Sequence, residues 1–569
     1  MTMSALDTVR SYHQQTKHQF DGYARSLGYL DWANQPDPFR RYRGCPLVPL
    51  VRGDFPVAAD YDAIRCGELP AAHPGDVQAI GRLLWASLAL SAWKQTKAGD
   101  RWAVRVNPSS GNLHPTEAYL LSVDRPGLSA GLYHYAPFHH ALERRAEITT
   151  ATFAQLGLAP DAMVVVLTSI PWREAWKYGE RAFRYCQHDV GHAVAALSLA
   201  AGMLGWRCAP LLGVDHRDLA RLAGIADHGT GPEAEIPELA VVITPTTGGT
   251  SPSPSTSVTV VREPRRAVIT PTHGMPNRLS KVHHDWPIIS EVSAATAVPG
   301  WTTEAEAQSA PVAARASSSS MTAITRTVDA LPLVRHRRSA VAMDGRTGIT
   351  RDEWLALLTA TRAPSSPTLF ASMTLPPAVA LLVFVHRVSG CEPGLYLLGR
   401  AEGHLTDLRP RIRPDFTWEV PTWCPPELAL VRLWQGDVGE TARTLSCYQA
   451  IAADGAFAVA MLARFDDTLV THGPSAYRHL YWECGVIGQV LYLEAEALTR
   501  PDRAIRGTGI GCFFDDGVHD LLGFNLSDGT SDRVDQSAWQ SLYHFTIGGP
   551  VDDQRLVTTD PYVHDLAPG

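Results

Sequence analysis

A short loop at Pro108, Ser109, Ser110, Gly111 and Asn112 is rich in groups that could bind a ligand. Serine hydroxyls and the asparagine amide both donate and accept hydrogen bonds, and glycine lets the main chain come close to a bound molecule. The set suits a flat ligand with a polar edge, such as the pyrimidine edge of a flavin. A loop of this composition is more often an ordinary turn, and its spacing alone does not separate the two interpretations.

The chain contains an internal repeat, which appears without a gap when Gly191 is placed on Gly485. The segment RAFRYCQHDVG then falls on SAYRHLYWECG, and apolar residues follow both at helical spacing. A second match joins GLYHY at Gly131 to GLYLL at Gly394, each preceded by an apolar run typical of a strand. The pattern predicts a duplicated unit of helices and strands.

The same alignment places Lys177 and Tyr178 on Thr471 and His472. The first half therefore holds two groups suited to proton transfer that the second half lacks. On the residues alone, the favoured interpretation of this pair is an exposed lysine and a packed tyrosine before a helix.

Composition narrows the class of protein. The chain has 569 residues, 45% of them hydrophobic and 19% charged, which is ordinary for a folded protein with more than one core. A formal net charge of −8 and a pI of about 6.3 lack the basic surface that nucleic acid requires. The nine cysteines include no CxxC pair, so we expect reduced thiols and no metal site. Without a signal peptide or an apolar membrane span, we expect a cytoplasmic protein with no membrane partner.

Several motifs together resemble the nitroreductase family of FMN enzymes: NPSSGNLHPTEAY, GLYHY, WKYGERAFRY and the helix that begins at DVGH. WKYGERAFRY is similar to the SagB-type dehydrogenases of that family, which oxidise azoline rings in modified peptides. The resemblance covers roughly residues 80–245 and 330–555. It implies an α/β (α+β) fold in which tandem nitroreductase-like domains form a pseudodimer within one chain.

This resemblance and the composition suggest a division of the chain. We expect an N-terminal extension over 1–75, a first domain over 76–245, a Pro/Ser/Thr-rich linker over 246–329 and a second domain over 330–569. Within the linker, PNRLSKVHHDWPIISEV carries enough apolar residues to dock on a domain surface. They are Leu279, Trp286, Ile288 and Ile289.

In the resembled family FMN lies between two subunits that contribute different parts of the site. The resemblance implies that the first half supplies the loop of Pro108, Ser109, Ser110 and Asn112. The second half would supply Arg337, Arg338 and Ser339 from HRRSA, Ile510, Gly511 and Cys512 from GTGIGCFF, and Arg555. Guanidinium groups suit the dianionic phosphate because they make paired, charge-assisted hydrogen bonds.

The sequence predicts that the reciprocal site is broken. The start of the first half offers only Arg82 in place of an arginine-rich turn. The loop APSSPT (363–368) puts Pro367 and Thr368 where the first half has Gly111 and Asn112, which stiffens the backbone and removes the amide. We therefore predict one FMN per chain.

The resemblance implies that Lys177 and Tyr178 are catalytic. Ring oxidation needs a base for a C–H proton while a hydride leaves for flavin N5. Since their ordinary pKa values are about 10.4 and 10, one should be lowered by burial or by Arg181 or Arg184. We expect an FMN-dependent oxidase of an azoline or related heterocycle in a peptide or peptide-like natural product, reoxidised by oxygen.

Two alternatives remain open at this stage: an NAD(P)H-dependent nitro or ene reductase, and a non-catalytic flavoprotein scaffold of a biosynthetic complex. The expected partner is a peptide or small-molecule substrate. The sequence leaves open a partner cyclase or carrier protein and further oligomerisation.

Overall fold

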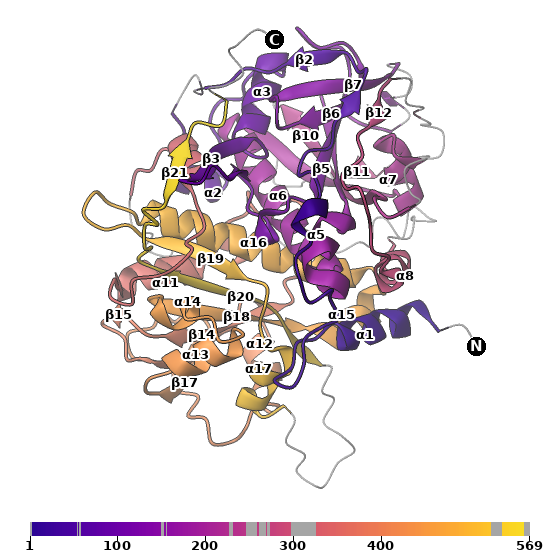
Figure 1. Cartoon of the computed structure of the whole chain (residues 1–569). Coiled ribbons are helices and arrows are strands. Elements are labelled where there is room, and N and C mark those ends of the chain that lie inside the picture. Colours follow the sequence, from indigo (N-terminus) through magenta and orange to yellow (C-terminus); the bar gives the residue numbers. More distant parts are fainter. Residues whose placement is uncertain are drawn as a thin grey trace.

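The computed structural model describes residues 3–53, 55, 58–149, 153–154, 156–226, 231–245, 259–260, 269, 273–297, 326–524 and 538–562. Two halves, each a sheet with helices, pack against each other, with the first half above and the second below in Figure 1. The predicted α/β (α+β) class is confirmed. The predicted boundaries at 75, 245 and 329 stay a prediction, since much of 246–329 lies outside the described residues.

The first half is built on an eight-stranded sheet in the order β11-β9-β10-β8-β5-β6-β7-β2. Its strands are β2 (Leu47–Pro49), β5 (Thr116–Ser122), β6 (Gly131–Ala136), β7 (Ala141–Glu147), β8 (Met163–Ser169), β9 (Trp206–Leu212), β10 (Ile236–Pro245) and β11 (Thr259–Val260). The central strands β5 and β8 are buried along their whole length, because the sheet is covered on both faces.

The second half repeats this arrangement with a six-stranded sheet in the order β17-β16-β14-β18-β20-β19. Its strands are β14 (Val379–Val385), β16 (Gly394–Leu398), β17 (Leu430–Gln435), β18 (Phe457–Arg464), β19 (Arg506–Ile510) and β20 (Trp539–Gly548). In chain order these strands correspond one to one with β5, β6, β7, β8, β9 and β10. The duplication expected from GLYHY and GLYLL is therefore present in the topology, since those segments form β6 and β16.

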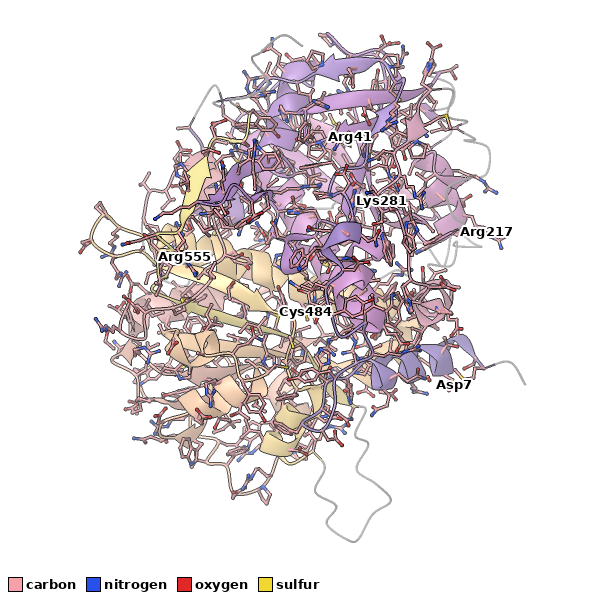
Figure 2. The ribbon with its side chains drawn as sticks, in the orientation of Figure 1. Asp7, Arg41, Arg217, Lys281, Cys484 and Arg555 are labelled. Atoms are coloured by element: carbon pink, nitrogen blue, oxygen red, sulfur yellow. The ribbon has the colours of Figure 1, made fainter. Side chains whose placement is uncertain are left out.

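Two long helices join the halves. They are α6 (Ala182–Met203) and α16 (Ala476–Ala497), each of 22 residues. They cross where Gly191 meets Gly485, since a Cβ built on Gly191 would lie only 2.8 Å from the Cα of Gly485. Cys484, beside that glycine, lies at the centre of the molecule (Figure 2). The two glycines paired by the sequence alignment are thus in contact at the crossing point, where only glycine allows the backbones to come so close.

Shorter helices occupy equivalent places in the two halves. They are α3 (Val77–Trp85) and α11 (Arg351–Ala360), α5 (Pro171–Tyr178) and α15 (Phe465–His472), α7 (His216–Leu222) and α17 (Asp515–Leu522), and α2 (Tyr61–Arg65) and α10 (Ala330–His336). The pairs occur at the same points of the strand sequence, α5 and α15 directly before the long helices and α7 and α17 between the last two strands.

A further pair of helices docks onto the long helices by their C-terminal caps. They are α1 (Ala5–Gln15), capped by Thr16, and α8 (Pro287–Ala295), capped by Thr296. Arg184 Nε donates to Thr16 Oγ1 at 2.9 Å, and Arg478 Nε donates to Thr296 Oγ1 at 2.9 Å. The α8 segment lies in the predicted linker, and its expected docking is confirmed by the burial of Leu279, Trp286 and Ile289.

The end of the chain returns to the first half. Strand β21 (Leu556–Thr559) adds to the hairpin of β3 (Leu90–Thr96) and β4 (Arg101–Arg105), which Figure 1 shows as a yellow strand beside the first half. The remaining elements are the pairs β1 (Tyr42–Arg43) with β12 (Met275–Pro276) and β13 (Ile349–Thr350) with β15 (Val388–Ser389), and the helices α12 (His404–Leu408), α13 (Gly439–Leu445) and α14 (Ile451–Asp454). In the described part of the chain, no helix combines the length and apolar character needed to cross a bilayer.

Candidate active site

A cavity of about 690 Å³ lies between the two halves. This volume falls in the range of about 300–1,000 Å³ that is usual for cofactor and ligand sites. Both halves line it: Pro108, Ser109, Ser110, Gly111, Asn112 and Tyr178 come from the first, and Arg337, Arg338, Ser339, Ile510, Gly511 and Cys512 from the second. The structure thus brings together the loop and the arginine turn that the sequence assigned to one site. Lys177 and Arg555 are the two predicted residues that do not line the cavity.

The loop is shaped by bonds within the chain. Gly111 and Asn112 both have left-handed backbones, with φ of 58° and 59°. Ser110 donates to Asp189 Oδ1 from its backbone N at 3.0 Å and from its hydroxyl at 3.1 Å. The Asn112 amide donates to the Ala103 carbonyl at 2.7 Å. Asn112 is therefore occupied in holding the loop, which differs from the free ring-edge contact that the sequence suggested.

Lys177 and Tyr178 end α5 directly against this loop. A Cβ built on Gly111 would lie 2.7 Å from the Tyr178 hydroxyl and 3.2 Å from Lys177 Nζ. Glycine is required there because any larger residue would displace one of the two groups. The amine, the phenol and the loop therefore meet at one place beside the cavity.

The electrostatic surroundings of Tyr178 differ from the expectation. Burial, followed by the neighbouring Glu174, raises the pKa of Tyr178 well above its usual value. Arg181 and Arg184 do not counteract this, because both guanidinium groups are bound to Asp515, at 2.8 and 2.6 Å. The expectation that either arginine lowers the pKa of Tyr178 is wrong, and the phenol keeps its proton at neutral pH.

Two buried carboxyl groups lie behind this pair. Burial raises the pKa of Asp189 to about 7, although Ser109 and Ser110 hydrogen-bond to it, and burial together with Asp189 raises that of Glu174 well above its usual range. Among the described residues, Asp189 Oδ2 and both carboxyl oxygens of Glu174 have no hydrogen-bond partner. Asp189 also lines the cavity.

The repeat allows the surroundings of Asp189 to be compared with those of its counterpart in the second half. Its counterpart Glu483 is bound to Arg400 and accepts the Ala378 N–H at 2.9 Å, so that carboxylate is fully compensated. Asp189 has no such cation. The sequence alignment paired Asp189 with Glu483 but gave no sign that only one of them is neutralised, because Arg400 lies far away along the chain.

Part of the cavity lining is basic. Arg337 donates to the carbonyls of Arg105 and Val106 at 3.2 and 3.1 Å, while its Nη1 has no hydrogen-bond partner in the part of the chain that the structure describes. Lys94 and Arg506 also line the cavity, and the sequence analysis missed both. Arg506 directly precedes GTGIG, which was an available signal, whereas Lys94 arrives from the β3 hairpin without one.

These cations lower one another's pKa values. Burial, with Arg337, Arg335 and Arg506 adding to it, lowers the pKa of Arg338 to about 9. Burial, Arg338 and Arg506 also lower the pKa of Lys94, against the opposing effect of Asp552 and Asp553. Glu496, 3.9 Å from Arg506, offsets only part of the positive charge. An anion such as a phosphate would supply the missing counter-charge, so the residues present fit the phosphate end of FMN.

Arg555 does not line the cavity, although its neighbours Gln554 and Leu556 do. Its side chain is 84% exposed and binds Asp553 at 2.8 Å, and Figure 2 shows it at the border of the two halves. Its predicted role in binding the phosphate stays a prediction, while Arg506 and Lys94 are basic residues that do line the cavity.

The reciprocal site is filled by the protein itself. Arg65, at the end of α2, donates to the Ser365 carbonyl at 2.5 Å and to the Ser366 hydroxyl at 3.3 Å. Glu494 neutralises it at 3.2 Å. Arg65 lies in the predicted N-terminal extension, before the segment in which the sequence offers only Arg82, so the absence of an arginine-rich turn there stays a prediction. The cavity beside Ala363 and Glu483 has only about 30 Å³, roughly enough for one water molecule.

Comparisons with known proteins agree with this fold. Residues 78–231, in the first half, match the model of the nitroreductase family. The crystal structure of an Anabaena variabilis protein, provisionally named a nitroreductase, superposes with a TM-score of 0.66 over 96% of this chain and 99% of its own, at 21% identity. The whole chain therefore has a fold seen before.

Two curated relatives match shorter stretches. A Methanocaldococcus jannaschii protein provisionally named a nitroreductase is 30% identical over 112 residues, which is 19% of this chain and 57% of the relative. The trifolitoxin-processing protein TfxB of Rhizobium leguminosarum bv. trifolii is 34% identical over 173 residues, which is 28% of this chain and 45% of the relative. The chain thus spans about half the length of these relatives.

Proposed function

We propose that this chain is an FMN-dependent oxidoreductase that oxidises an azoline or related heterocycle in a peptide or peptide-like natural product. The observation that carries the proposal is the large cavity, which Tyr178 and the serine loop line together with an under-compensated basic cluster, with the Lys177 amine beside the loop. The similarity to a protein named for trifolitoxin processing supports a peptide substrate. The substrate and any partner cyclase or carrier protein belong to the proposal.

The cofactor would be held from both halves. Arg337, Arg338 and Arg506 would bind the phosphate, while the loop around Ser110 would meet the edge of the ring. FMN, when bound, accepts the hydride and so supplies the oxidising chemistry. Because Arg65 fills the reciprocal place, we propose one FMN per chain, between nitroreductase-like domains at 76–245 and 330–569.

The two residues at the end of α5 would take different roles. Tyr178 keeps its proton, so it can donate a hydrogen bond to the substrate but cannot act as a base near neutral pH. Lys177 is then the group that removes the ring proton, and only its neutral amine can do so. Asp189 would fix the loop through Ser110 and adjust the charge beside the reaction.

The direct test is the conversion of a thiazoline-containing peptide to its thiazole, followed by mass spectrometry as the loss of two hydrogens. We expect the wild type to carry about one flavin per chain and to turn over in air. Lys177→Met should remain yellow and lose at least about 100-fold in kcat, in line with the usual contribution of a general base. Tyr178→Phe should lose less, because it removes only a hydrogen bond.

The repeat provides a matched control. Thr471 and His472 occupy the equivalent positions, so Thr471→Met and His472→Phe should leave turnover unchanged. A protein without flavin, or one with two flavins per chain, would overturn the assignment of the cavity. Rapid bleaching of the flavin by NADPH without oxygen, with no thiazole formed in air, would instead identify a reductase.

A further inference from the structure

Two cysteines that the proposed reaction does not use meet at the edge of the cavity. Cys512 lines the cavity just after β19, and Cys447 lies in the turn that follows α13. The Cys447 thiol hydrogen-bonds to the Cys512 sulfur, and both residues are half-buried and free. Two sulfurs in contact beside a proposed redox site form the arrangement of a reactive dithiol.

The two segments that carry these cysteines are tied together. Gln449 Nε2 donates to the Cys512 carbonyl at 2.9 Å, and the Phe514 N–H donates to the Leu445 carbonyl at 2.9 Å. Cys447 and Tyr448 both have left-handed backbones, with φ of 52° and 59°. Such a conformation is uncommon outside glycine and persists where surrounding contacts impose it. The turn is thus held in a form that presents Cys447 to Cys512.

Positive charge and hydrogen bonds favour a thiolate at Cys512. The Ala24 N–H donates to His18 Nδ1 at 2.9 Å, so Nε2 carries the ring proton and can donate to the Cys512 sulfur. The hydrogen bond from Cys447, together with that from His18, lowers the pKa of Cys512, and the nearby Arg181 acts in the same direction. Cys512 is therefore the nucleophile of the pair, while Cys447 keeps its proton.

We propose that Cys512 and Cys447 form a peroxide-responsive pair that closes reversibly to a disulfide at the edge of the cavity. The Cys512 thiolate attacks one oxygen of hydrogen peroxide, which gives a sulfenic acid and releases hydroxide. The Cys447 thiol then attacks that sulfur, which forms the S–S bond and releases water. The balance is two thiols and one peroxide to one disulfide and two waters.

The source of peroxide is the one part that rests on the proposed function, because an oxidase that uses oxygen releases peroxide from this cavity. The thiol chemistry itself requires only the two cysteines and the oxidant. Closing the disulfide removes the negative charge of the thiolate from the cavity edge. It also ties the 445–449 turn covalently to the segment that follows β19.

The experiment treats the purified full chain with one equivalent of hydrogen peroxide, without substrate, and measures mass before and after reduction by dithiothreitol. We expect the loss of two hydrogens, a Cys447–Cys512 linked peptide after digestion, and full reversal. In Cys447→Ser the disulfide cannot form, so dimedone should trap a sulfenic acid at Cys512. In Cys512→Ser, Cys447 should stay reduced.

Cys66 provides the internal comparison. The residue as a whole is exposed, but partial burial of its thiol raises the pKa of that thiol. At pH 7 iodoacetamide should alkylate Cys512 at least ten times faster than Cys66. Peroxide that leaves both cysteines reduced, or that oxidises Cys66 first, would overturn the proposal. Since no turnover is measured, disulfide formation in an inactive protein would count against the proposed function alone.

Discussion

Replacing Arg338 by Met should move protein stability and flavin affinity in opposite directions. Burial and neighbouring cations lower the pKa of this guanidinium from 12.5 to about 9, which corresponds to roughly 4–5 kcal/mol of unfavourable interaction at about 1.4 kcal/mol per pKa unit. The side chain is only half-buried, so solvent screens part of this, and we expect about 2 kcal/mol. Since the folded pKa is depressed, this cost is present at every pH below about 9. The flavin-free variant should therefore be more stable than the wild type at pH 7.

Flavin binding should change the other way. A charge-assisted hydrogen bond contributes about 1.5–3 kcal/mol, so its loss should raise the Kd for FMN by roughly 10- to 150-fold. Calorimetric titration of flavin-free protein with FMN measures the affinity, and thermal unfolding without FMN measures the stability. Riboflavin, which lacks the phosphate, should bind the variant and the wild type alike.

Arg555→Met is the matched control, because this exposed arginine binds Asp553 and does not line the cavity. It should change neither quantity. If Arg338→Met lowers the stability of the flavin-free protein and leaves the FMN affinity unaltered, the basic cluster is structural and the proposed phosphate site is lost.

Two further substitutions test the asymmetry of the halves. Asp189→Asn removes a carboxyl whose pKa rises from 3.8 to about 7 on folding. The folded wild type binds this proton more tightly than the unfolded chain does, so the wild type loses stability as the pH rises from about 4 to 7. The variant should therefore be up to about 4 kcal/mol more stable than the wild type at pH 8 and little more stable at pH 4. Unfolding midpoints measure this difference. A difference that does not vary with pH would contradict the raised pKa of the buried carboxyl. Arg65→Met breaks a buried ion pair with Glu494, so thermal unfolding should show a loss near the lower end of about 3–5 kcal/mol, because Arg326 still binds that glutamate. Its flavin content should equal that of the wild type, and loss of flavin would show that the reciprocal place is part of the site.

The sequence predicted those parts of the fold that rest on local pattern. The apolar spacing along α6 and α16 identifies two buried helices, and the ungapped match places Gly191 and Gly485 at equivalent points. The serine loop and the arginine turn were recognisable because each is a compact motif. That both line one cavity followed from the expectation of a pseudodimer.

What the sequence could not predict depends on residues distant in the chain. Arg181 was expected to act on Tyr178, but it binds Asp515, which lies more than 300 positions away and neutralises it. Lys94 reaches the cavity from a hairpin that the last strand, β21, completes from the other end of the chain. No local pattern records which cation meets which carboxylate.

The contrast between the two clefts also shows why one of them is suited to a ligand. In the reciprocal cleft, the described charges Arg65 and Glu483 both have partners, since Glu494 binds Arg65 and Arg400 binds Glu483. In the open cleft Asp189 and the basic cluster stay under-compensated, which costs folding free energy. Such a cost persists where a bound anion or a reaction offsets it, and it would otherwise be removed by the same kind of pairing that the sister cleft displays. The electrostatic imbalance between two equivalent places thus points to the functional cleft more directly than any single motif.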